Sequence, residues 1–224
     1  MQLILLSLAM TVLSCGGLTA ATLATLSLAD DGHDLVTYNS WKGQSFSLST
    51  TAETGKITAA TLRLEIVIAN TKLVARVVGS VAGTGAPDMS DVYTQLRITT
   101  NPTGTTLQPV FFQEDPEITS RLMVQGATYW LVIGMTDEDH EQASPTGLIR
   151  WHFASTNGQD PDAPAGWQVG VMTAASGTAG SNWSPVATTP YLFDVTLTPA
   201  PIPEPGLAAL LLPAALFSFR RRRP

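Results

Sequence analysis

The feature that most constrains the fold is a hydrophobic alternation with a period of two residues, which recurs throughout residues 44–198. In the segment TLRLEIVIAN, residues 61–70, the apolar side chains face one way while Arg63 and Glu65 face the other. A period of two is that of a β-strand, whose successive side chains point to opposite faces. The pattern predicts about eight strands, which lie within residues 44–49, 61–70, 72–79, 91–100, 128–135, 148–155, 166–173 and 191–198.

The segments between these strands are clusters of Gly, Pro, Asn, Asp and Ser, such as GTGAPDMS and NGQDPDAPAG. No segment of the body repeats apolar residues at the spacing of a helix. Short strands separated by such turns are typical of an antiparallel β-sandwich, and we favour a jelly-roll-like topology. Asn70 and Thr71 are interpreted as a hairpin turn. A domain of this length can bury an adequate core without disulfides.

The chain begins with an apolar stretch, residues 3–13, which is followed by small residues. This pattern predicts a helical signal peptide over residues 1–21, cleaved near Ala20 or Ala21, although no Lys or Arg precedes the apolar core. Cys15 is the only cysteine. It is either removed with the signal peptide or lipidated, since Val12-Leu13-Ser14 before it loosely resembles a lipobox.

The chain ends with a proline-flanked glutamate, an apolar segment over residues 206–219 and four arginines. As a helix the apolar segment would span roughly 21 Å, less than the ~30 Å of a bilayer core. The arginines would resist translocation and stay in the cytoplasm. The prolines would hold the backbone extended, as a protease groove requires.

This three-part segment, residues 201–224, resembles the PEP-CTERM sorting signal of Gram-negative bacteria. The matching residues are the motif Pro203, Glu204 and Pro205, the apolar residues 206–219, and the basic residues Arg220, Arg221, Arg222 and Arg223. The resemblance implies that a membrane-embedded exosortase removes the tail and passes the body to the cell surface or matrix. Such proteins usually accompany exopolysaccharide and biofilm production. The alternative is a tail anchor that is never cut.

The body, residues 22–200, has a second resemblance. The segments GQSFSLSTTAETGKITAATLRL, GATYWLVI, GWQVGVMT and TPYLFDVTL look like strands of the choice-of-anchor R domains. The matching residues are mostly those of core strands, so the resemblance implies a fold and no catalytic residues.

The charge of the body excludes some partners. Four of the chain's 12 Lys and Arg residues are the terminal arginines, so the rest has 8 basic against 18 acidic residues, a formal charge near −10. Such a body should be repelled by nucleic acid and by anionic lipid surfaces. We therefore expect no nucleic-acid partner, and only transient membrane contact through the C-terminal segment.

Catalytic patterns are missing from the sequence. His33, His140 and His152 form no HxH or HExxH pair, and there is no GxSxG elbow. His152 alternates with Trp151 and is expected to face solvent beside Arg150. We predict that the protein is not an enzyme and has no cofactor.

The acidic clusters are interpreted mainly as solvated loop charge. They include Glu114, Asp115 and Glu117, and also Asp160 and Asp162. The densest run, TDEDHE, offers a weak Ca²⁺ candidate at Asp137, Asp139 and Glu141, because Ca²⁺ prefers several oxygen ligands from loops.

The chain has five tryptophans, and tryptophan rings can stack on sugars. Trp130, Trp151 and Trp167 lie in predicted strands and are expected in the core. Trp41 and Trp183 lie in polar, loop-like sequence, where they either stack on a sugar or cap the ends of the sandwich. The predicted function is that of an exported, non-catalytic surface or biofilm-matrix protein. The alternative is a carbohydrate-binding module for exopolysaccharide.

Overall fold

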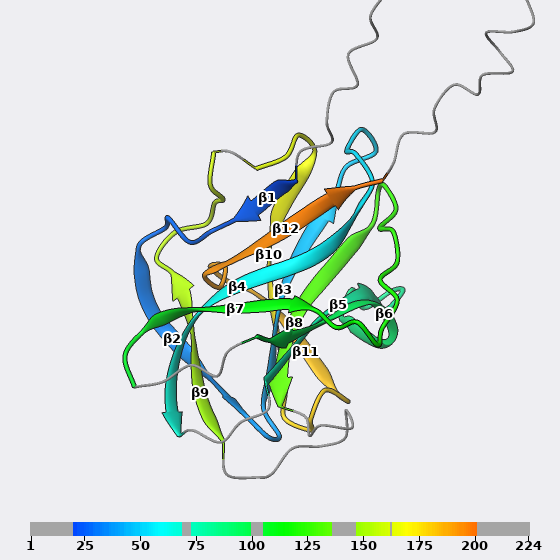
Figure 1. The fold of residues 1–224 in the computed structure, drawn as a ribbon. Coiled ribbons are helices and arrows are strands. Elements are labelled where there is room, and N and C mark those ends of the chain that lie inside the picture. The colour runs from blue at the N-terminus through cyan, green and yellow to red at the C-terminus, as the bar shows by residue number, and fades with distance from the viewer. Residues whose placement is uncertain (1–19, 69–72, 100–104, 136–146, 162, 201–224) are drawn as a thin grey trace, which may run out of the picture.

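A computed structural model describes residues 20–68, 73–99, 105–135, 147–161 and 163–200. These residues form an all-β body without helices, in which twelve strands build one continuous antiparallel sheet that curls upon itself (Figure 1). The predicted terminal helices and the sorting motif lie outside the described residues. In the part of the chain that the structure describes, no helix is long and apolar enough to cross a membrane.

The curled sheet has two layers, which meet where β6 pairs with β7 over only three residues. The first layer contains β1 (Ala21–Ala24), β12 (Phe193–Pro199), β4 (Gly55–Ile68), β7 (Gln108–Glu114), β9 (Leu148–Ala154) and β2 (Asp30–Thr37). The second contains β6 (Pro87–Ile98), β5 (Leu73–Ser80), β8 (Thr128–Met135), β3 (Trp41–Leu48), β10 (Trp167–Ser176) and β11 (Trp183–Ala187). In Figure 1, β12, β4 and β7 cross in front of β10, β3 and β8.

The pairing of the central strands is nested along the chain. β6 pairs with β7, β5 with β8, β4 with β9 and β3 with β10. Nested antiparallel pairs of this kind form a long ribbon, and folding that ribbon over gives a jelly-roll-like arrangement. The sandwich-like, antiparallel all-β prediction is therefore confirmed.

The eight strands predicted from the alternation are all present, and β8 has the bounds expected from the sequence. The sequence prediction missed β1, β2, β7 and β11. The predicted hairpin across Asn70 and Thr71 is wrong. β4 pairs with β12, β7 and β9, whereas β5 pairs with β6 and β8, so these consecutive strands lie in different layers and form no hairpin; Asn70 and Thr71 themselves lie outside the described residues.

The core lies between the two layers and contains the predicted inward faces. Leu62 and Leu64 of β4 are fully buried, whereas Ile68 at the end of that strand is 47% exposed. Trp130, Trp151 and Trp167 are buried, as predicted. The remaining core includes aromatic side chains from both layers, such as Phe46, Tyr129, Phe112 and Phe193.

One buried polar side chain stabilises an irregularity in this core. The register of β10 against β3 shifts between Val169 and Thr173, which leaves backbone groups without ladder partners. Gln44, fully buried, donates from Nε2 to the Gly170 carbonyl at 2.7 Å and accepts from the Tyr191 amide at 2.9 Å. The bond to Gly170 therefore replaces one that the bulge removes, and the bond from Tyr191 ties the segment before β12 to β3.

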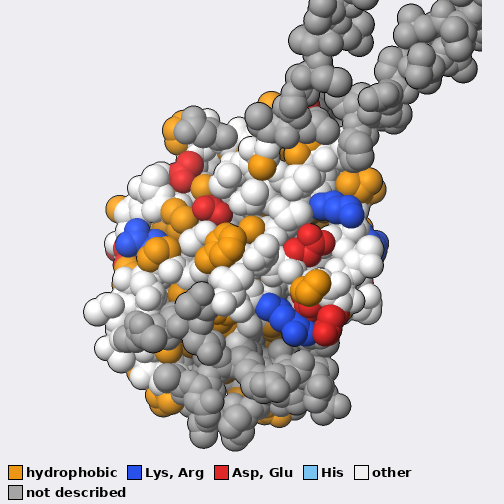
Figure 2. All heavy atoms as spheres, viewed as in Figure 1, with side chains coloured by type: hydrophobic (Ala, Val, Ile, Leu, Met, Phe, Trp, Pro, Cys, Tyr) orange, Lys and Arg blue, Asp and Glu red, His pale blue; other side chains and the backbone are white. Residues whose placement is uncertain are grey.

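The outer surface of the first layer is chemically mixed. Figure 2 shows charged side chains of both signs scattered among polar and apolar ones on the described part of this face, with no continuous positive patch.

Candidate functional site

Among the described residues, a group of ligand-type side chains lies together on the outer face of three neighbouring strands. β9 pairs with β2 on one side and with the end of β4 on the other. Cross-strand partners share a face, so the pairs His33–His152 and Glu65–Arg150 bring these side chains together. Each of His33, Glu65 and His152 offers one ligand atom within 4.8 Å of the other two.

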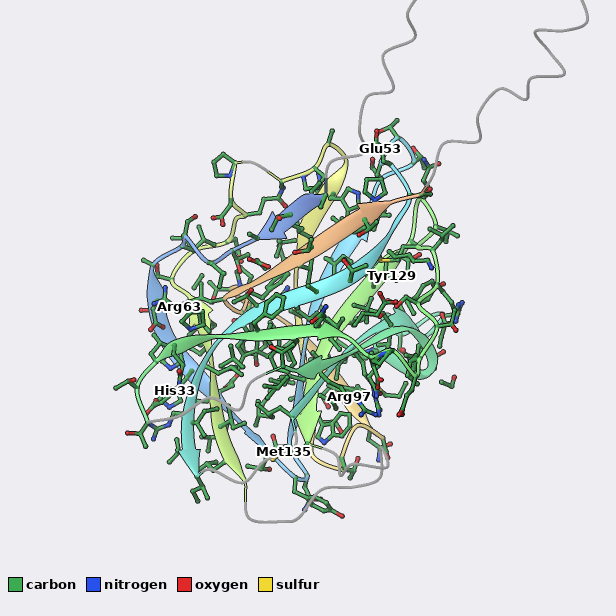
Figure 3. The ribbon with its side chains drawn as sticks, in the orientation of Figure 1. His33, Glu53, Arg63, Arg97, Tyr129 and Met135 are labelled. Carbon is green, nitrogen blue, oxygen red and sulfur yellow. The ribbon has the colours of Figure 1, made fainter. Side chains whose placement is uncertain are left out.

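His152 is the buried member of this cluster. Its side chain was expected to face solvent, but the residue is only 8% exposed, so that prediction is wrong. The reason is that β2 and β4 flank β9, and their outer side chains cover it. The His33 ring lies over the His152 ring with centroids 5.3 Å apart. Figure 3 places the exposed His33 at the β2 and β9 side of the molecule.

The two nitrogens of His152 have different surroundings. Nδ1 lies 2.8 Å from Oδ2 of Asp30, at the start of β2. Nε2 is buried and has no hydrogen-bond partner in the described part of the chain, and Oε2 of Glu65 lies 3.8 Å away. One nitrogen is therefore anchored to a carboxylate, and the other points into the cluster.

Glu65 is held by Arg150, its cross-strand partner. Nη1 of Arg150 donates to both carboxylate oxygens, at 2.9 and 3.0 Å. This hydrogen bond, together with the nearby positive charge, lowers the pKa of Glu65 below its ordinary value, against an opposing effect of burial. Glu65 is therefore an anion at neutral pH, and its oxygens have a fixed orientation.

The predicted acidic sites have different outcomes. The Ca²⁺ candidate at Asp137, Asp139 and Glu141 lies outside the described residues. Asp115, expected as solvated loop charge, is fully buried, and that expectation is wrong. Asp115 accepts from Nε of Arg97 at 2.6 Å and from Nε2 of Gln95 at 3.0 Å, so it has a structural role in joining β6 to the end of β7.

The two candidate sugar-binding tryptophans are neighbours in one row across β3, β10 and β11. Ser176 of β10 pairs with Trp41 on one side and with Trp183 on the other. Trp41 is 4% exposed and packs in a small second core cluster, with its Nε1 donating to the Tyr38 carbonyl at 3.1 Å. Trp183 is partly buried against the same cluster and donates to the Gly180 carbonyl at 3.0 Å. Of the two rings, only that of Trp183 has appreciable exposed area.

Sequence reasoning missed the cluster of His33, Glu65 and His152. It placed Glu65 and His152 on the non-core faces of their strands, and both side chains do point away from the core. It could not know that β9 lies beside β4, because 87 positions separate Glu65 from His152. The polar strand that contains His33 was not predicted.

The fold and these sites define an antiparallel, jelly-roll-like β domain with a polar cluster on one outer face and a tryptophan row near the opposite edge of the sheet. No protein-family model matches the chain, and no curated protein is significantly similar to it.

Proposed function

We propose that this protein is an exported, non-catalytic component of the bacterial surface or biofilm matrix, sorted by an exosortase-type system. The observation that supports the proposal most is the C-terminal segment, with Pro203-Glu204-Pro205, an apolar stretch and Arg220–Arg223 in that order. A signal-like apolar stretch at the N-terminus is consistent with export.

The organisation of the domain fits such a role. Its buried polar side chains, among them Gln44 and Asp115, are used to tie strands together. The surface of the first layer has mixed charge on its described part (Figure 2). Strand β1 begins at Ala21, so cleavage after Ala20 would leave the domain complete.

Cell fractionation tests this proposal. We expect the wild-type protein in the surface or matrix fraction, where added protease can reach it. A variant with Arg220–Arg223 replaced by alanine should lose correct sorting, because these arginines are proposed to hold the tail on the cytoplasmic side. Replacing Arg63 with alanine is the matched control and should leave sorting unchanged. Recovery of the wild-type protein from the cytoplasm would refute export.

A second candidate function, binding of exopolysaccharide, is favoured by the partial exposure of Trp183 at the edge strand β11. An exposed aromatic ring can stack on a sugar, whereas the buried Trp41 would serve to support it from behind. Trp41 therefore contributes to this candidate only indirectly.

Affinity electrophoresis with the producer's own polysaccharide tests the second function. Binding should retard migration of the full chain and change its tryptophan fluorescence. Trp183→Ala should abolish both effects, while Phe111→Ala, which removes a 47% exposed ring on the other layer, should retain them. Absence of retardation in the wild type would remove this candidate and leave the matrix role standing.

A further inference from the structure

The surroundings of His152 leave its buried Nε2 available to bind a cation. A carboxylate can only accept hydrogen bonds, so the contact with Asp30 places the proton on Nδ1 of His152. In the neutral ring, Nε2 then carries a lone pair and no hydrogen. It is buried, has no hydrogen-bond donor among the described residues, and faces the Glu65 carboxylate at 3.8 Å. Two electron-rich groups that face each other at this distance repel, and a metal ion between them would relieve the repulsion.

The donor set fits a transition-metal ion. Imidazole nitrogens and one carboxylate suit Zn²⁺, whereas Ca²⁺ and Mg²⁺ prefer oxygen ligands alone. In a tetrahedral zinc site with bonds of about 2.0–2.1 Å, neighbouring ligand atoms are about 3.4 Å apart. The 3.8 Å separation of His152 Nε2 from Glu65 Oε2 is close to this value. His33 is exposed, so its ring can turn to complete the set.

The residues around the ligand groups are those expected around a metal ion. Asp30 holds Nδ1 of His152, which is the carboxylate–histidine arrangement that orients metal ligands and raises their basicity. Arg150 fixes the Glu65 carboxylate through both oxygens. The positive charge of Arg150 and the negative charge of Asp30 cancel. The Glu65 carboxylate therefore leaves the cluster with a net negative charge, which favours binding of a cation.

We propose that His33, Glu65 and His152 bind a divalent transition-metal ion, best matched by Zn²⁺, on the outer face of β2, β4 and β9. Three protein ligands leave one tetrahedral position, and the exposure of His33 opens that position to solvent or to a group from a partner. The site is independent of the sorting signal and of the tryptophan row, so its test does not depend on the proposed function.

The direct test is isothermal titration of ZnCl₂ into the full chain, produced without a histidine tag and freed of metal with EDTA. We expect one Zn²⁺ per chain, and a melting temperature that rises with Zn²⁺ because the ion binds the native state. CaCl₂ and MgCl₂ at the same concentrations should give neither effect. A wild-type chain that does not bind Zn²⁺ would overturn the proposal.

Variants locate the site. His33→Ala changes an exposed side chain, so the protein should fold normally, and its affinity for Zn²⁺ should fall by at least about 10-fold. Glu65→Gln should weaken binding as well. Asp30→Asn removes a positioning residue and should weaken binding by about 10- to 100-fold without changing the stoichiometry.

His140→Ala is the matched control, because it removes the third histidine of the chain, and it should bind as the wild type does. Unfolding curves recorded in EDTA show whether each variant is folded. The proposal is wrong if His33→Ala binds Zn²⁺ as tightly as the wild type, or if His140→Ala loses binding.

Discussion

Trp41 of the second core cluster lies closely against Gly134 of β8, and the substitution Gly134→Ala tests this contact. A methyl group at Gly134 would overlap the indole of Trp41, far inside van der Waals contact. The ring would have to withdraw by more than about 1 Å to restore an ordinary separation of about 3.5–4.0 Å. Since Trp41 is 4% exposed, that movement must disturb its packed neighbours.

The size of the effect follows from these contacts. Overpacking of a well-packed core costs about 1–3 kcal/mol. Withdrawal of the ring also weakens the 3.1 Å hydrogen bond from Trp41 Nε1 to the Tyr38 carbonyl, which contributes about 1 kcal/mol. Alanine gains about 0.5–1 kcal/mol over glycine through its lower backbone entropy. We expect Gly134→Ala to reduce the free energy of unfolding by about 2–3 kcal/mol.

Urea unfolding followed by tryptophan fluorescence measures this change, with the slope m expected to stay constant. Gly177→Ala is the matched control, because beyond its own chain neighbours no atom lies within 4 Å of the added methyl group, and it should shift stability by no more than about 0.5 kcal/mol. In a Trp41→Ala background the Gly134→Ala substitution should become nearly neutral, which gives a coupling energy of about 2 kcal/mol. A loss of the same size in both backgrounds would refute the reasoning.

Two further predictions concern buried polar groups. Burial raises the pKa of Tyr129 to about 12, so unfolding should become easier as pH rises from about 10 to 12, by at most about 1.4 kcal/mol per pH unit. The folded state retains the proton that the unfolded state loses, and Tyr129→Phe should make that slope shallower in alkaline urea titrations, with the remainder due to Tyr191, whose pKa burial also raises; an unchanged slope would contradict the assignment. Asp115→Ala should cost about 3 kcal/mol in the same urea assay at neutral pH, because it deprives Gln95 of a buried acceptor and breaks the pair with Arg97. Glu117→Ala, which removes an exposed partner of Arg97, should cost less than about 1 kcal/mol, and equal losses for the two variants would argue against a structural role for Asp115.

The strands that the sequence predicts well are those buried on at least one face. Alternation in β4 and the apolar run of β8 reflect burial directly, so their positions follow from the residues alone. β2 has the sequence DDGHDLVT, and among its residues only Val36 is fully buried. β11 contains a proline and lies at the sheet edge. None of its residues is fully buried, so its sequence shows no clear hydrophobic alternation.

The candidate site depends on long-range pairing, which a single sequence does not specify. His33 lies on a strand without a hydrophobic signal, and its proximity to Glu65 results from β9 lying between β2 and β4. The same pairing explains why His152 is buried although it points away from the core. The burial of Trp41 could not be predicted from the sequence either, because its polar sequence neighbours gave no indication of the cluster that covers it.

Mass spectrometry of the protein recovered from the cell surface or matrix tests the proposed function most directly. An exported and sorted domain should begin near Ala21, with β1 retained, and should contain no peptide from the C-terminal apolar segment. Peptides that include Phe219 or Arg220 in the mature surface protein would contradict removal of the tail by an exosortase-type system.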